Sequence, residues 1–225
     1  GTVTVGSGYT TTISGTTSGT SNLNTVSGSN YALSTGLLNI ATAGTLTANN
    51  STITLTGTSG TLFTRVGTFT SGGSTVSVTS ASGTPTLNSG TISFYNLTID
   101  PSSLTISTST DAITVTNTLN VATGDTLSLI SGQTLTHSGA TLTLNGTISG
   151  DGLYVYQSAT AFPTTGTISV DLRMYATSND QSMGARTYGG DVEIYNSSSS
   201  TARTVTLGTG ASQTLTFSGN LTLTV

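Results

Sequence analysis

The stretch LNVATGDTLSLISGQTLTHSGATLTLNG, from Leu119 to Gly146, decides the fold class of this chain. Leu, Val and Ile stand at every second position for a few residues, and Gly-Asp, Ser-Gly or Asn-Gly pairs interrupt each run. Such alternation is typical of β-strands with one buried face, and such pairs are typical of turns. Thr, the most frequent residue, is β-branched and favours extended backbone. The stretch therefore predicts short strands joined by tight turns.

The composition removes several functional classes. Only 5% of the 225 residues are charged, the net charge is -4 and Lys is absent, so the basic surface that binds nucleic acid is missing. Cys is absent too, which excludes disulfides and thiolate metal sites. No apolar run approaches a membrane span, and no signal peptide begins at Gly1. We expect no nucleic acid partner, no membrane span in this chain, and either a mature product or a fragment.

The chain repeats itself. LNIATAGTLT (38–47) matches LNVATGDTLS (119–128), and STITLTGT (51–58) matches ATLTLNGT (140–147). These copies indicate a module of roughly 80–100 residues made of short strands, as in tandem β arrays and solenoids. On composition we divide the chain into an N-terminal Thr/Ser/Gly-rich β segment (1–36), β-solenoid repeats (37–152), aromatic and charged coils or an excursion (153–193), and the start of the next repeat (194–225).

Two all-β architectures fit short strands with frequent turns: a parallel β-solenoid (β-helix) and a tandem β-sandwich. The solenoid is favoured because Leu, Ile and Val dominate the inward positions, and Trp and a Cys pair of the immunoglobulin type are absent. Thr and Ser also recur in register, as stacked ladders require. A coil of about 20 residues would add one strand spacing of about 4.8 Å to the axis.

Three stretches carry a family resemblance: YNLTI (95–99), ARTYGGDVEIYN (185–196) and ARTVTLGTGASQTLTFSGNLTL (202–223). They resemble blocks in the large Thr/Ser/Gly-rich β-helical repeat proteins of bacterial cell surfaces, which are adhesin-like. The similarity covers most of the chain after about Leu37. It implies an extracellular or cell-surface location and a filamentous or adhesive role. It carries over no catalytic residue.

The candidates for chemistry are few. His137, the only histidine, lies beside a turn, where we expect an exposed or stacking role; a triad with Ser131 or Ser138 and Asp125 can be drawn only on paper. Some β-helices are polysaccharide-active enzymes that use paired carboxylates. The residues that could serve here are Asp171, Asp180, Asp191, Glu193, Arg173 and Arg186. We expect them to be solvated loop and strand-edge groups, and we expect no enzyme activity.

Other polar groups suggest binding or modification. Cofactors are not expected, although oxygen-rich loops could hold a structural calcium at Asp151, Asp180 or Asp191. Thr-x-Thr pairs occur in ice-binding solenoids, but a flat array needs a fixed period, and the pairs Thr45/Thr47, Thr52/Thr54, Thr141/Thr143 and Thr214/Thr216 are irregularly spaced. Acceptor sites for N-glycosylation stand at Asn49, Asn50, Asn96, Asn145, Asn196 and Asn220, largely by chance in so Ser/Thr-rich a chain.

The chain ends decide the favoured function. The open ends of a solenoid are rows of unpaired backbone groups that natural solenoids cap, and neither end of this sequence reads as a cap. The end residues with plain strand patterns are Thr2, Val3, Thr4, Val5, Leu221, Leu223 and Val225. We therefore expect a structural subunit of an extracellular filament or surface layer that joins copies of itself head to tail. The alternative is an adhesin or glycan-binding stalk segment of a longer protein that contacts cell-surface glycans.

Overall fold

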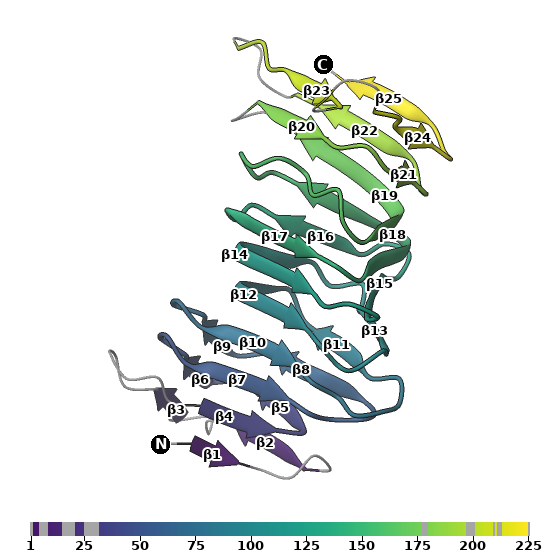
Figure 1. Ribbon diagram of the computed structural model, residues 1–225. Coiled ribbons are helices and arrows are strands. Elements are labelled where there is room, and N and C mark those ends of the chain that lie inside the picture. The colour runs from purple at the N-terminus through teal and green to yellow at the C-terminus, as the bar shows by residue number, and fades with distance from the viewer. Residues whose placement is uncertain are drawn as a thin grey trace.

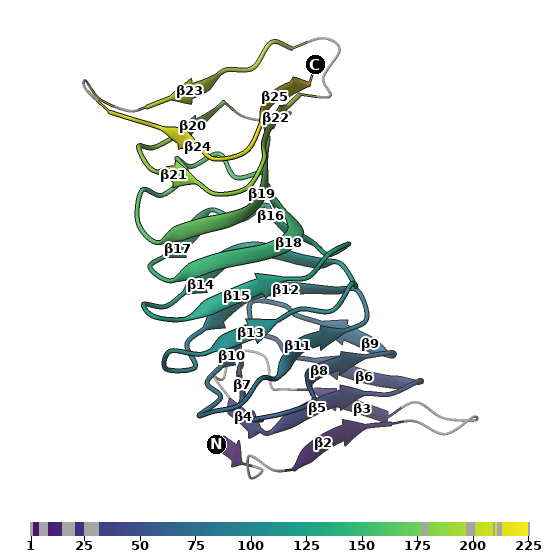
Figure 2. The same ribbon diagram turned by 90° about the vertical axis from the view of Figure 1, so that its right-hand side faces the viewer.

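The structure is a computed structural model, and it forms an elongated stack of β-strands (Figures 1 and 2). It describes residues 2–4, 9–14, 21–24, 32–176, 180–196, 201–208, 210 and 213–224. All regular secondary structure in these ranges is β-strand. None of the described segments is a helix that could cross a membrane.

Each turn of the stack passes through three ladders in the same order, which we call A, B and C. Ladder A contains β1 (Thr2–Thr4), β4 (Ala32–Thr35), β7 (Thr52–Leu55), β10 (Thr75–Val78), the second halves of β12 (Ile92–Ile99) and β14 (Ile113–Val121), and β17 (Thr141–Leu144). Farther along the same side lie Phe162, which bridges to Met183, and the pair β20 (Gln181–Met183) and β23 (Val205–Leu207).

Ladder B runs through the whole described stack. Its strands are β2 (Thr10–Ile13), β5 (Leu37–Ile40), β8 (Thr61–Arg65), β11 (Thr86–Ser89), β13 (Thr105–Ser107), β15 (Thr126–Leu129), the first halves of β18 (Thr147–Tyr156) and β19 (Thr167–Tyr175), β21 (Thr187–Tyr188) and β24 (Thr216–Phe217).

Ladder C has two parts. The shorter part consists of β3 (Ser21–Asn24), β6 (Gly44–Thr47) and β9 (Thr68–Thr70). The longer part joins the first halves of β12 and β14, β16 (Thr134–His137), the second halves of β18 and β19, β22 (Val192–Tyr195) and β25 (Leu221–Thr224).

The predicted parallel β-solenoid is confirmed, and the tandem β-sandwich is excluded. Every pairing between described strands is parallel, whereas a sandwich pairs its strands mainly antiparallel. The expected coil of about 20 residues holds in the middle of the stack, where Thr126 pairs with Thr147 and Thr147 with Thr167. Near the ends of the stack the turns are longer than expected, since Thr10 pairs with Leu37 and Thr187 pairs with Thr216.

The core is a set of stacked apolar side chains inside the three ladders. In β15 the sequence TLSL buries both Leu side chains and turns Thr126 and Ser128 outward, as the alternation predicts. Two aromatic groups widen the core. The first is Phe63, Phe69 and Phe94, and the second is built around Tyr156, Phe162 and Tyr188, with ring centroids 5.0–6.3 Å apart within the contacts of each group. The strands between residues 153 and 193 pair into the same ladders as the rest.

Candidate functional site

The C-terminal turn leaves core positions open to solvent. Leu221 stands in register with Val192 and, one turn earlier, Leu172; those two are 1% exposed, but Leu221 is 46% exposed. In the neighbouring column Leu223 follows Ile194 and is 69% exposed. Val192 is therefore buried and Ile194 half-buried beneath the last turn, whereas no described turn covers Leu221 and Leu223.

The backbone of the same turn is also unpaired on its outer side. The carbonyl of Asn220 accepts a hydrogen bond from the N–H of Val192 in β22, and that of Thr224 accepts one from the N–H of Asn196, which follows β22. Because neighbouring residues of a parallel strand point their backbone groups in opposite directions, those of Leu221 and Leu223 face away from the stack. Among the described residues, no strand pairs with the outer edges of β23, β24 and β25.

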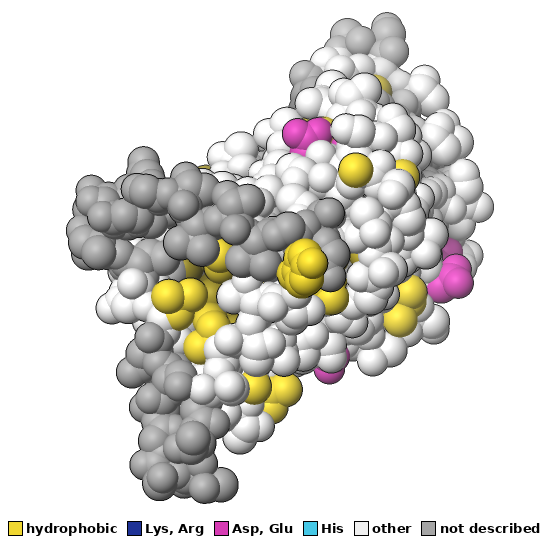
Figure 3. Space-filling model, turned by 90° about the horizontal axis from the view of Figure 1, so that it is seen from below, with side chains coloured by type: hydrophobic (Ala, Val, Ile, Leu, Met, Phe, Trp, Pro, Cys, Tyr) yellow, Lys and Arg dark blue, Asp and Glu magenta, His cyan; other side chains and the backbone are white. Residues whose placement is uncertain are grey.

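The N-terminal end has a matching arrangement. Strands β1, β2 and β3 pair inward with β4, β5 and β6, and no other described strand pairs with them. Leu23 in β3 is 39% exposed, whereas its register partner Leu46 is buried. Figure 3 looks onto this end and shows several apolar side chains at the surface. Both ends thus offer strand edges from ladders A, B and C.

The end residues named from the sequence lie on these surfaces where they are described. Thr2, Val3 and Thr4 form β1, and Leu221 and Leu223 belong to β25; Val5 and Val225 lie outside the described residues. The sequence reading missed Leu207, which is 47% exposed at the end of β23, and Leu23. Both follow the alternating pattern, but only the three-strand turn shows that they belong to end turns.

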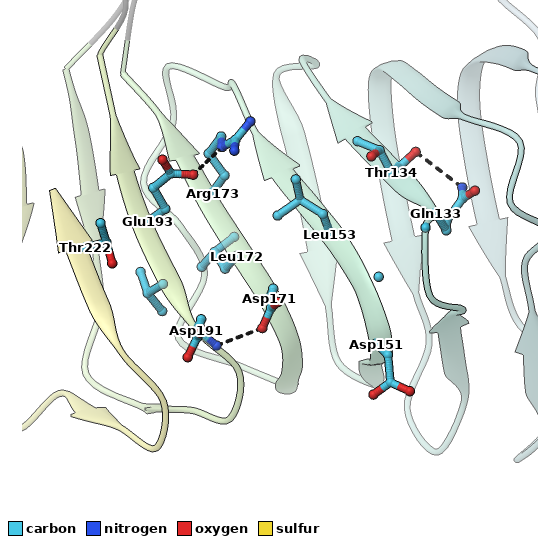
Figure 4. Close-up of a pocket in the computed structure, with 13 residues that line it drawn as sticks. Gln133, Thr134, Asp151, Leu153, Asp171, Leu172, Arg173, Asp191, Glu193 and Thr222 are labelled. Atoms are coloured by element: carbon cyan, nitrogen blue, oxygen red, sulfur yellow. Dashed lines mark hydrogen bonds and ion pairs between the residues drawn. The ribbon is translucent and has the colours of Figure 1, made fainter. Parts of the chain in front are cut away.

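A groove of about 440 Å³ runs along the outer side of ladder C (Figure 4). Successive turns contribute its polar lining, so its direction follows the solenoid axis. The lining side chains that are at least partly exposed and polar are Thr134, Asp151, Asp171, Arg173, Asp191, Glu193 and Thr222, whereas Gln133 is buried in the wall. The groove brings together three of the four carboxylates that the sequence suggested for acid–base chemistry.

An ion pair lies in the wall of this groove. The Arg173 Nε donates to Glu193 Oε2 at 2.6 Å, and the guanidinium lies 5.1 Å from the ring centre of Tyr195. The Thr224 hydroxyl donates to Glu193 Oε1 at 2.7 Å. That hydrogen bond, followed by the interaction with Arg173, holds the pKa of Glu193 below its ordinary value. Glu193 is therefore held as a carboxylate, whereas a general acid needs a raised pKa.

Most other carboxylates accept backbone amides from a neighbouring turn. Asp171 accepts from the N–H of Asp191 at 2.9 Å, and Asp191 accepts from the N–H of Asn220 at 2.7 Å. Asp180 accepts from the N–H of Thr204 at 3.0 Å. Asp111 and Asp125 make the same kind of bond lower in the stack. Because these groups fasten turns to one another, their geometry is that of structural residues.

Arg186 is separated from the groove and clamps a corner. Its guanidinium donates to the carbonyls of Pro163, Thr165 and Gly166 and lies 5.6 Å from the ring centre of Phe162. Burial lowers the pKa of Arg186 from its ordinary value. Asp180 is likewise not part of the groove lining. The six candidate residues therefore do not form one site.

Of the two roles expected for His137, the exposed one was wrong, and the only ring contact that it makes in the described structure is a tilted one with Tyr156. Its side chain faces inward in β16 with no exposed surface, and its ring centre lies 5.7 Å from that of Tyr156. Nε2 is 3.4 Å from the carbonyl oxygen of Asn117, and Nδ1 has no partner in the described structure. Neither a Ser hydroxyl nor Asp125 is among these contacts, so the triad drawn on paper is not assembled.

The residues that the sequence suggested for N-glycosylation and for calcium lie at corners and on strand surfaces. Asn50, Asn145 and Asn220 are exposed, whereas Asn49, Asn96 and Asn196 are half-buried and hydrogen-bonded through their side chains. In the part of the chain that the structure describes, no group of three or more His, Cys, Asp or Glu side chains could hold a metal ion. Asp151, Asp180 and Asp191 thus do not converge on a calcium site.

No protein family, curated protein or solved structure matches this chain. The assignment of a Thr-rich β-solenoid therefore depends on the strand register and the buried core described above.

Proposed function

We propose that the chain is a structural subunit of an extracellular filament or cell-surface layer, in which solenoids join head to tail through their end strands. The observation that carries the proposal is the C-terminal turn, where Leu221 and Leu223 continue the columns of the buried Leu172 and Met174 yet are 46% and 69% exposed. A further turn of the same kind would bury them.

The energetics require strand pairing as well as apolar contact. Complete burial of a Leu contributes about 1.5–3 kcal/mol, so covering the exposed fractions of Leu207, Leu221 and Leu223 contributes roughly 2–5 kcal/mol. Association costs about 4–15 kcal/mol in lost freedom of motion. Apolar burial alone is therefore insufficient. Hydrogen bonds at about 0.5–1.5 kcal/mol each, formed along the edges of β23, β24 and β25, supply the rest.

The geometry favours a contact that does not close. All described strands are parallel, so the edges at one end and the edges at the other are different surfaces that can add to each other in the same direction. Repetition of such a heterologous contact produces a filament. Only 5% of the residues are charged, so electrostatic repulsion between stacked copies is weak.

A second candidate is a glycan-binding stalk segment of a longer, adhesin-like surface protein. In that case further turns of the same polypeptide cover the end strands. The groove on ladder C favours glycan contact, since it combines the carboxylates of Asp171 and Asp191 with Arg173. Beside it the rings of Tyr175 and Tyr195 lie 5.0 Å apart at 32°. Hydroxyl-rich ligands use such hydrogen-bonding groups together with aromatic faces.

The test compares two Lys variants of the last strand by sedimentation velocity and electron microscopy of the purified chain. Leu223→Lys places a charge on the inward column at the open end, and we expect it to weaken end-to-end association by about ten-fold or more. Thr222→Lys is the matched control, because Thr222 is the neighbouring residue but faces the groove. Dispersed monomers of the unsubstituted chain at high concentration would contradict the filament proposal, and so would equal effects of the two variants.

A further inference from the structure

One outer face of the solenoid carries a regular array of hydroxyl groups. On ladder B four successive turns have the sequence Thr-x-Ser, and all four are in register. We call this array the Thr-x-Ser face: Thr105/Ser107 in β13, Thr126/Ser128 in β15, Thr147/Ser149 in β18 and Thr167/Ser169 in β19. The Thr column continues through Thr187 to Thr216. All eight side chains alternate with buried Ile or Leu and therefore face outward.

These hydroxyls are available to an outside ligand. No hydrogen bond joins the side-chain hydroxyl of any of the eight to another described residue, in contrast to ladder A, where the Asn96 amide donates to the Thr75 hydroxyl. The face has no charged side chain within the array. Each side chain is half-buried or exposed, as expected for neighbours that shield one another in a stacked row. The array is thus a neutral, unsatisfied set of donors and acceptors.

The spacing of the array is that of a two-dimensional lattice. Backbone hydrogen bonds fix neighbouring turns at about 4.8 Å, and residues i and i+2 of one strand lie about 6.6 Å apart. Thr and Ser are separated by one buried residue in every turn, so both columns keep this spacing. Thr is restricted at χ1 by its branched Cβ, which keeps the hydroxyl and methyl groups of a column in one orientation.

We propose that the Thr-x-Ser face binds ice. Water molecules in the ice lattice repeat at distances close to both spacings of the array, so the hydroxyls can join ordered water at many points together. A single hydroxyl–water contact contributes almost nothing in competition with liquid water. Eight rigidly held groups act together, because the first contact positions the rest. The methyl groups of Thr add apolar contact with the ice surface.

A soluble small molecule fits this face less well than a crystal surface does. The groove lies on ladder C, and none of the eight Thr-x-Ser residues lines it. An array with two fixed spacings favours a ligand that repeats at the same spacings. The activity is independent of the proposed filament, since the array occupies the side of the rod, although a filament would lengthen the array.

The irregular Thr-x-Thr spacing that spoke against ice binding concerns different residues. Thr45/Thr47 lies in β6 of ladder C, whereas Thr52/Thr54 and Thr141/Thr143 lie in β7 and β17 of ladder A. Thr214 precedes β24, which begins at Thr216. The four pairs therefore never formed one face. The regular signal is Thr-x-Ser, which recurs every 20 or 21 residues from Thr105 to Thr167.

The experiment measures thermal hysteresis and partition into a growing ice front for the purified full chain and two double variants. Thr126→Tyr with Thr147→Tyr disrupts two register partners of the Thr-x-Ser face. Thr114→Tyr with Thr136→Tyr is the matched control, because these two are also half-buried register partners but lie on ladder C. Circular dichroism establishes that each variant keeps its β-structure.

We expect the unsubstituted chain and the ladder C variant to partition into ice. For the ladder B variant we expect thermal hysteresis and partition into ice to fall by about ten-fold or more. The proposal is overturned if the unsubstituted chain is excluded from ice like an inert protein. It is also overturned if the two folded double variants retain, or lose, activity to the same extent. Adsorption to crystalline cellulose or chitin in place of ice would assign the face to a crystalline polysaccharide and equally overturn it.

Discussion

Acid sensitivity at His137 is the prediction that the structure supports in most detail. The imidazole occupies an inward position of β16 between Val115 of β14 and Tyr156 of β18, with no exposed surface. Removal from water disfavours the charged form, and it lowers the pKa of His137 from 6.5 to about 4. The folded solenoid therefore keeps this ring neutral under conditions in which the unfolded chain protonates it.

The sign and size of the effect follow from proton linkage. Between pH 6.5 and pH 4 the unfolded state binds a proton at His137 that the folded state does not, so stability falls as the pH falls. The contribution is fully present above pH 6.5. A difference of 2.5 in pKa corresponds to a loss of about 3 kcal/mol by pH 4.

The assay is urea denaturation at a series of pH values for the unsubstituted chain and for His137→Leu, which keeps an apolar side chain in the core but cannot titrate. Carboxylates such as Glu193 contribute to both proteins, so they cancel in the comparison. We expect the unsubstituted chain to lose about 3 kcal/mol more than the variant between pH 7 and pH 4. Parallel pH profiles, or an imidazole that titrates near pH 6.5 by NMR, would refute the buried neutral histidine.

Three further outcomes test the core, the corners and the carboxylates. Phe94→Ala removes a fully buried ring that contacts Phe63, and it should lower the free energy of unfolding by about 3–5 kcal/mol in denaturant titrations. Gly83→Ala should destabilise more than Gly132→Ala in thermal melts, since both have φ above +80° but only the Cβ at position 83 would collide with a backbone carbonyl of the preceding turn. Asp191→Ala should lower stability by about 1 kcal/mol, because two exposed hydrogen bonds from Asn220 are lost, and reducing-sugar assays should detect no polysaccharide cleavage before or after the substitution.

The alternation of Leu and Thr predicts the strands and, in stretches such as TLSL of β15, which side chains are buried; the parallel pairing needed the further observation that Thr and Ser recur in register. In TLTH the alternation places His137 on the same face as Leu135, whereas its position beside a turn favours exposure. The burial was missed because a polar residue was assumed to face solvent. The core around it accepts the ring, since the ring of Tyr156 lies against it at a tilt of 48°.

The candidate sites were harder to predict, since they depend on how the turns close. Corner lengths vary, so Thr10 pairs 27 residues onward while Thr147 pairs 20 residues onward, and no fixed period aligns every ladder. The groove joins Asp151, Asp171 and Asp191 only because their turns stack. The exposure of Leu223 depends on the absence of another turn above it among the described strands, which the local sequence does not encode.

The most direct test of the central claim is a cryo-EM density map of the assembled material at a resolution that separates strands. We predict parallel strands at about 4.8 Å spacing that continue without interruption from the β23–β24–β25 edge of one copy into the β1–β2–β3 edge of the next, with Leu223 buried at the junction. An assembly joined through the sides of the rods, with Leu223 still in solvent, would contradict the claim.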